Sequence, residues 1–243
     1  MSVKEVFEEI REFCISHSDE LLIQKYSRYF REGFKTRGLS MEAIDQMVGE
    51  LSGRPGMSLP FILELARELI PDGWYEEGAI AMLLLEKRKK HFSKETFLEL
   101  DWWFRIGMEN WAHTDFMGGR IICVFLEKAI ISTSDLSSWL QSDRKYQRRV
   151  VPVSLIRPMK SSGKAEPWLD FLEPLMADRE RVVHQGMGWF LREAWKKDPH
   201  PVEDFLMKYR NTAPRLIFQY ATEKMEREQR DRYRRDKGLS RRL

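Results

Sequence analysis

The sequence predicts an all-α protein, an α-solenoid in which helix pairs stack into one concave domain. Three observations predict this fold. Apolar residues recur at helical spacing, and no alternating strand pattern or Asn-Gly hairpin appears. Turn signals such as Pro71-Asp72-Gly73 and Asp198-Pro199 separate the helical stretches. Similar segments also recur at intervals of 30 to 41 residues.

The helical stretches follow from the apolar periodicity and from the turn signals between them. We expect helices near residues 3–16, 19–32, 41–51, 59–70, 74–90, 94–107, 114–131, 134–141, 144–157, 166–176, 179–197, 200–209 and 214–236. Pro152 falls inside one of them, so we expect a kink or a restarted helix there.

A weak internal repeat supports the solenoid. Residues 78–87 resemble residues 119–128, and two later segments continue the series. The matched apolar positions, separated by 41, 30 and 35 residues, are Leu85, Leu126, Ile156 and Leu191. Periods of this size, each holding two helices, are typical of α-solenoids. The alternative is an ordinary helical bundle with similar buried helices.

Composition indicates a soluble protein. Charged residues make up 33% of the 243 residues, the mean hydropathy is −0.51, and no apolar run approaches a membrane span. The acidic, amphipathic start differs from a secretory signal. Cys14 and Cys123 are too few for a disulfide framework or a thiolate metal site. We therefore expect a protein of the reducing cytoplasm.

The net charge of +3 is unevenly distributed. Residues 1–100 hold 14 Lys/Arg and 18 Asp/Glu, a balance of −4, whereas residues 101–243 hold 27 and 20, a balance of +7. A basic half is expected of a protein that faces a polyanion. Much of the excess lies in a basic tail, about 223–243, which contains Arg227, Arg230, Arg232, Arg234, Arg235, Lys237, Arg241 and Arg242. The alternative for this tail is a solvated helix end or disorder.

Residues suited to a damaged nucleotide gather between positions 111 and 189. Trp111 and Asp115 are four residues apart, an arginine pair follows at 148–149, and Trp189 comes after Gly188. Indole faces attract cations, carboxylates stabilise developing positive charge, and arginines hold phosphates. Together these abilities suit a cationic, damaged nucleotide in DNA.

Three blocks of this region resemble one family: Trp111-Ala112-His113-Thr114-Asp115, Tyr146-Gln147-Arg148-Arg149-Val150-Val151 and Gly188-Trp189-Phe190-Leu191-Arg192-Glu193. With Arg28-Tyr29-Phe30, Phe34 and Gly38, they resemble the bacterial DNA alkylation repair glycosylases built from HEAT-like repeats, the AlkD family. The likeness spans roughly residues 20–220. It departs at Ala112, where relatives commonly carry an acid, and near Met41, where they carry a proline.

The resemblance implies a DNA glycosylase of base excision repair that removes cationic N3- or N7-alkylated purines from duplex DNA without extruding the base. Asp115 would stabilise the oxocarbenium-like sugar and place a water. Trp111 and Trp189 would contact the lesion and its deoxyribose, and Arg149 would hold a phosphate. Arg148, Lys145, Tyr29 and Arg192 would be further DNA contacts. It also implies a bacterial protein of the cytoplasm, associated with the nucleoid and acting as a monomer.

Each of these residues has a structural alternative. Asp115 could be a helix N-cap, because Thr114-Asp115 precedes an apolar stretch. Arg148 could pair with a neighbouring helix, since adjacent helical residues point about 100° apart. His113 could be a surface or structural histidine. Tyr29, Lys145 and Arg192 could lie on a solvated face. Tryptophans in helical proteins usually lie in the core. We expect the following five to lie in the core or at repeat junctions: Trp102, Trp103, Trp139, Trp168 and Trp195.

The sequence contains no motif typical of other enzyme chemistries. The sequence has no phosphate-binding GxxxxGK[ST] loop and no HExxH or cysteine cluster, so we expect no cofactor and no metal. No lysine is placed as an obvious Schiff-base nucleophile, which predicts a monofunctional glycosylase. Two alternatives remain: a non-catalytic solenoid that binds distorted or branched DNA, and a scaffold for protein partners.

Overall fold

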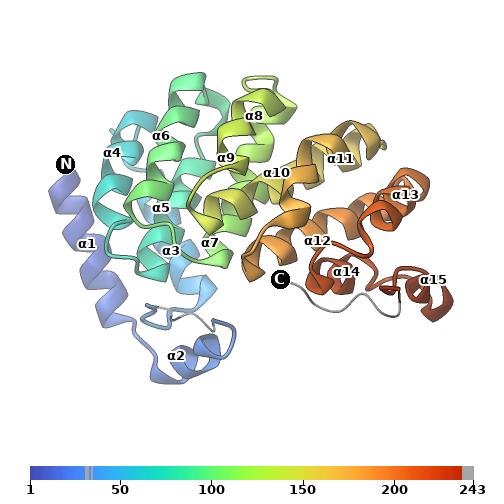
Figure 1. Cartoon of the computed structure of the whole chain (residues 1–243). Coiled ribbons are helices and arrows are strands. Elements are labelled where there is room, and N and C mark those ends of the chain that lie inside the picture. The colour runs from blue at the N-terminus through green and yellow to red at the C-terminus, as the bar shows by residue number, and fades with distance from the viewer. Residues whose placement is uncertain (31–32, 34, 237–243) are drawn as a thin grey trace. The chain divides into compact units, whose positions relative to one another are not determined.

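The computed structural model describes residues 1–30, 33 and 35–236, and among these residues the regular structure is helical, without a β-strand (Figure 1). The predicted all-α class is therefore confirmed. The chain divides into two compact units, Met1–Met117 and Gly118–Leu243, here called the N-terminal and the C-terminal unit. The predicted single concave domain stays a prediction. No helix in the described ranges is long and apolar enough to cross a membrane.

Side-chain caps start most helices of the N-terminal unit. Their bounds are α1 Val3–Ser16, α2 Glu20–Ser27, α3 Met41–Ser52, α4 Leu59–Leu69, α5 Tyr75–Glu86, a 3-10 turn Lys89–His91, α6 Lys94–Ile106 and α7 Trp111–Phe116. Ser2, Asp19, Ser40, Ser58, Ser93 and Asn110 each accept a backbone N–H at a helix start. The predicted start at residue 114 is wrong, because Asn110 starts α7 three residues earlier. Residues 31–32, predicted as the end of the second helix, lie outside the described residues.

Helix α5 forms the centre of the N-terminal unit. All residues from Glu76 to Leu85 are buried, and the helix packs against α1, α3, α4 and α7. A helix buried all round carries no amphipathic stripe, so its two acidic residues must find partners inside the protein.

The buried carboxylate of Glu76 organises the segment before α3. It accepts hydrogen bonds from the Thr36 hydroxyl at 2.5 Å and from the backbone N–H groups of Arg37 and Gly38 at 3.0 Å each. Gly38 has a φ of +74°, and a Cβ there would lie 2.3 Å from the Asp19 carbonyl oxygen. A glycine is required because both its backbone conformation and its surroundings exclude a side chain.

The neighbouring carboxylate, Glu77, joins two further elements. It pairs with the guanidinium groups of Arg11 on α1 and Arg37, both at 3.4 Å. Glu77 is buried, so these partners offset part of the cost of removing its charge from water.

The C-terminal unit begins within a π-helical segment. The bounds are the π-helix Met117–Ile122, α8 Cys123–Glu127, a 3-10 turn Thr133–Leu136, α9 Ser137–Leu140, α10 Lys145–Ser162, α11 Glu166–Leu172, a 3-10 turn Glu173–Ala177, α12 Arg181–Trp195, α13 Pro199–Tyr209, α14 Arg215–Ala221 and α15 Arg227–Asp231. Helix α12 packs against both α10 and α14. Helix α10 runs through Pro152 and Pro158 without restarting, so the predicted restart is wrong.

The basic tail is folded as far as it is described. The predicted helix 214–236 is wrong, because α14 ends at Ala221 and α15 begins at Arg227. Tyr233 is 1% exposed, and Arg210 pairs with Asp236 at 2.8 Å. Disorder is therefore wrong for this part of the tail. Lys237, Arg241 and Arg242 lie outside the described residues.

The tryptophan prediction holds in part. Trp103 and Trp139 are buried. Trp168 and Trp195 are half-buried. Trp102 is 46% exposed, so the core position expected for it is wrong, and the alternative of a repeat junction stays a prediction.

Replacing Glu76 should destabilise the N-terminal unit. We expect Glu76→Gln to lower the free energy of unfolding by about 2 kcal/mol. The hydrogen bonds lose their charged acceptor, and the backbone N–H that faces the new NH₂ group is left without an acceptor. The exposed Glu68 on α4 offers the matched control, and Glu68→Gln should stay within about 0.5 kcal/mol of the wild type. Urea denaturation measures both. Equal stabilities of the two variants would contradict the anchoring role of Glu76.

Candidate functional site

Trp111 and Asp115 lie on α7 of the N-terminal unit. The Asn110 side chain caps this helix by accepting the His113 N–H at 2.8 Å, so Trp111 is the first helical residue and Asp115 the fifth. Asp115 as a helix N-cap is therefore wrong. Residues four apart share one helix face, so the half-buried indole and the half-buried carboxylate lie on the same side of α7.

Trp111 also holds the segment that follows α2. Its indole N–H donates to the Tyr29 carbonyl at 3.3 Å, and its ring stacks on Phe30 with centroids 5.0 Å apart and planes 19° apart. The Tyr29 side chain itself is 64% exposed. Of the other residues that carried the family resemblance in this segment, Gly38 is held by Glu76, and Phe34 lies outside the described residues.

His113 fixes α7 to α5. Its Nε2 donates to the Tyr75 carbonyl at 2.8 Å, and its Nδ1 then accepts from the Asn110 amide at 2.9 Å. The imidazole stacks on the Tyr75 ring at 5.1 Å. A Cβ on Gly78 would lie 2.5 Å from the imidazole, so a glycine is needed for the two helices to approach this closely. Burial lowers the pKa of His113 to about 4, against the opposing hydrogen bond to Tyr75. His113 is a structural residue, one of the two roles expected for it.

The arginine pair lies on α10 of the C-terminal unit. Arg148 donates to the Asp178 carboxylate at 2.6 and 3.2 Å and to the Ser142 carbonyl at 2.5 Å. Arg149 is 5% exposed and donates to the Val182 carbonyl at 2.6 Å. Arg148 thus makes the ion pair considered for it, and three of its N–H groups donate to partners within the unit.

Two glycines let α12 approach its neighbours on both sides. A Cβ on Gly186 would lie 3.1 Å from the Arg149 side chain, and a Cβ on Gly188 would lie 2.5 Å from Tyr220 on α14. These approaches bring Gly186 against the stem of Arg149. Trp189 follows directly and is half-buried, unlike a core tryptophan.

The remaining candidates of the C-terminal unit have local partners. Arg192 pairs with Glu193 at 3.3 Å and with Glu223. Burial raises the pKa of Glu193, but hydrogen bonds from Lys160 and Lys196 outweigh it and hold the pKa at about 2. The anionic Glu193 therefore ties α12 to Lys160 on α10, at 2.6 Å.

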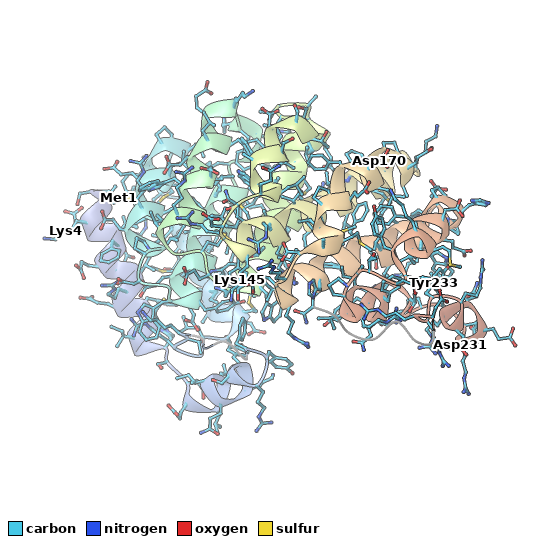
Figure 2. All side chains as sticks on the ribbon, in the orientation of Figure 1. Met1, Lys4, Lys145, Asp170, Asp231 and Tyr233 are labelled. Atoms are coloured by element: carbon cyan, nitrogen blue, oxygen red, sulfur yellow. The ribbon has the colours of Figure 1, made fainter. Side chains whose placement is uncertain are left out.

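Lys145 begins α10. Its ammonium lies 5.3 Å from the centroid of the Tyr146 ring. Figure 2 labels Lys145 at this end of α10. The residue is half-buried, so part of its side chain reaches solvent.

Three positioning residues were missed in the sequence: Asn110, Tyr75 and Gly78. One signal was present, since Gly107 ends α6 with a φ of +156° and an Asn three residues later is a typical N-cap. Tyr75 and Gly78 act through contacts between elements, which no local pattern reveals. No group of three or more His, Cys, Asp or Glu side chains that could hold a metal occurs among the described residues.

Comparison with known proteins gives the family. The model of the family described as "DNA alkylation repair enzyme" matches residues 10–225, so the chain belongs to this family. A solved structure described as a predicted DNA alkylation repair enzyme from Enterococcus faecalis has the same fold, with a TM-score of 0.69, 15% identity, and coverage of 87% of this chain and 98% of that chain. No curated protein matches the sequence. The resemblance is confirmed, and the family supports a role in DNA repair.

The buried His113 should make stability pH-dependent. Its folded-state pKa of about 4 lies below the ordinary 6.5, so the stability that the neutral ring contributes is present above pH 6.5 and is lost as the pH falls toward 4. We expect wild type to lose about 2 kcal/mol more than His113→Gln between pH 7 and about 4.5. Chemical denaturation at the two pH values measures this. The control His200→Gln, at an exposed histidine, should keep the full wild-type loss. A His113→Gln curve parallel to that of wild type would refute the assignment.

Proposed function

We propose that this protein is a DNA glycosylase that hydrolyses the N-glycosidic bond of cationic N3- or N7-alkylated purines in duplex DNA. The observation that carries the proposal is the arrangement on α7. An aromatic and a carboxylate share one helix face, Asn110 performs the capping, and Asp115 is half-buried within the helix rather than used at its start. Membership of the DNA alkylation repair enzyme family supports DNA as the substrate.

The chemistry assigned to Asp115 follows from the substrate. N-alkylation gives the purine a positive charge, so the base leaves without much help from an acid. The sugar then becomes oxocarbenium-like, and a carboxylate beside it stabilises the developing charge and orients the attacking water. A single carboxylate is sufficient for both tasks, and no metal or cofactor is required.

Trp111 and Trp189 are proposed to contact the cationic lesion and its deoxyribose. An indole face attracts a cation with about 0.5–2 kcal/mol. This attraction is enough to favour charged lesions but too small to account for the whole acceleration of base release. Both indoles are half-buried, as an aromatic wall with one accessible side would be. Damage is read by its charge and by weakened stacking, without extrusion of the base.

Arg149 is proposed to hold a phosphate near the lesion. Arg148, Lys145, Tyr29 and Arg192 are proposed as further DNA contacts. The Tyr29 side chain is the most open of these. For Arg148, the N–H groups not bonded to Asp178 or Ser142 are those left for such a contact.

A second candidate function is binding of distorted or branched DNA without catalysis. The basic balance of residues 101–243 favours it as much as it favours a glycosylase. The two functions differ in their need for Asp115.

Removing the charge of Asp115 should abolish base release. We expect Asp115→Asn to release 7-methylguanine and 3-methyladenine from methylated duplex DNA about 100-fold more slowly than wild type, or not at all, because one preorganised charge is lost. DNA affinity should stay within about twofold, since phosphates are bound elsewhere. Single-turnover release and fluorescence anisotropy measure the two quantities.

Asp170, exposed on α11 and labelled in Figure 2, provides the matched control. Asp170→Asn should release both bases at the wild-type rate. Equal release by Asp115→Asn and wild type would remove Asp115 from its role. Absence of release by wild type itself, with intact binding, would favour the non-catalytic function.

Replacing Arg149 should weaken binding to all DNA sequences alike. Arg149→Met keeps an apolar stem against Gly186 but removes the guanidinium, so the slope of log affinity against log salt concentration should decrease by about 1. Anisotropy titrations at several salt concentrations measure the slope. Arg157→Met, the comparison variant on the same helix, breaks the pair with Glu127 and should keep the wild-type slope. An unchanged slope in a folded Arg149→Met protein would exclude the phosphate contact.

A further inference from the structure

A basic pocket of about 640 Å³ lies in the C-terminal unit, and its lining includes none of the residues proposed above to contact DNA. It is formed by α14, α15 and the turns that follow them, and Figure 2 labels Asp231 and Tyr233 at this end of the unit. Its charged lining consists of Arg215, Arg227, Arg230, Arg234 and Asp231. Gln219 and Thr222 also line the pocket, and the Thr222 hydroxyl donates to the Phe218 carbonyl at 2.8 Å.

Arg215 is the built-in cation of this pocket. Its guanidinium lies 4.5 Å from the centroid of the Phe218 ring and donates to the Tyr233 carbonyl at 2.8 Å. Burial lowers its pKa, and the nearby charge of Arg235 lowers it further. Its neighbours are the Arg210 and Tyr233 carbonyls, the Phe218 ring and the charge of Arg235, so within the described residues no carboxylate pairs with its positive charge.

The other arginines add to this excess of charge. Arg234 pairs with Asp231 at 2.8 Å. Arg227 and Arg230 are exposed, and in the described part of the chain no carboxylate pairs with either of them. Four guanidinium groups therefore face one carboxylate among the described lining residues, an excess of positive charge that favours an anionic ligand.

The chemistry of the lining selects the class of anion. Guanidinium groups match phosphate oxygens with paired N–H donors, and phosphates at several positions suit several guanidinium groups better than one small carboxylate does. The volume falls in the range of pockets that hold a small molecule, so a stretch of sugar-phosphate backbone fits. Three of the arginines, Arg227, Arg230 and Arg234, lie beyond residue 225, where the family match ends.

We propose that this pocket binds a phosphate group of the DNA backbone, in addition to the DNA contacts proposed above. This inference rests on the proposed action on DNA. The pocket would add a contact to the DNA backbone and raise the affinity for all sequences alike, because phosphate contacts do not depend on the base sequence.

The test compares binding of a short, unmodified duplex by variants of the two exposed arginines. We expect the double variant Arg227→Ala/Arg230→Ala to lower affinity about tenfold at low salt and to reduce the salt slope by about 1. Asp231→Asn should do the opposite and tighten binding, because it removes the carboxylate from the lining. Opposite effects at neighbouring positions cannot arise from general loss of folding.

Lys89→Ala/Lys90→Ala is the matched control, since it also removes two positive charges, here from the exposed 3-10 turn of the N-terminal unit. It should keep the wild-type slope. An equal loss of slope in both double variants would show a response to bulk charge and would overturn the proposal. An unchanged slope in Arg227→Ala/Arg230→Ala would overturn it directly.

Inorganic pyrophosphate separates the backbone from a free phosphate compound. If it raises the melting temperature of wild type but not of Arg227→Ala/Arg230→Ala, while both bind DNA with the same slope, the ligand is a free phosphate compound and the backbone assignment falls. The unmodified duplex also separates the two proposals. Wild type that binds it through the pocket but releases no methylated base would refute the glycosylase and leave the pocket intact.

Discussion

The N-terminal unit depends on two adjacent buried carboxylates, Glu76 and Glu77, in the first turn of α5. A buried charge lowers stability unless several partners lie close to it. The segments that supply these partners are therefore held in place beside the two carboxylates. Glu76 binds the segment Thr36–Leu39, and Glu77 binds Arg11 on α1. The next residue, Gly78, gives His113 of α7 its place. One helical turn therefore positions both the N-terminal segment and the helix that bears Trp111 and Asp115.

Helix starts were predictable from the sequence at Ser2, Ser40 and Ser93, where a polar cap precedes an apolar stripe, but the Asn110 cap was missed. They were not predictable where tertiary contacts decided. The charged run after residue 222 favours helix locally, but Met225 and Tyr233 are both buried, which requires the chain to turn between α14 and α15. Periodicity carries no information about such packing, because it describes one segment at a time.

For the candidate site, the sequence predicted which residue types to examine but not how they are held. The predicted helix start at residue 114 left Trp111 outside the helix, so the sequence did not place Trp111 and Asp115 on one helix; the Asn110 cap does. The 100° rule did predict that Arg148 and Arg149 have different surroundings. The partners of these arginines, Asp178 and the Val182 carbonyl, lie about 30 residues away in the chain and follow only from the fold.

Asp115 also bears on the choice between catalysis and simple binding. Phe30 covers one face of the Trp111 ring, and the Tyr29 carbonyl engages its N–H, so the opposite face is the one left for a cationic base. A carboxylate four residues further along repels a polyanion, and a surface that merely bound DNA would be better without it. A negative charge beside an indole is useful when the partner is a positive charge that grows during the reaction. The pair on α7 therefore supports the proposed action on a reacting, cationic nucleotide.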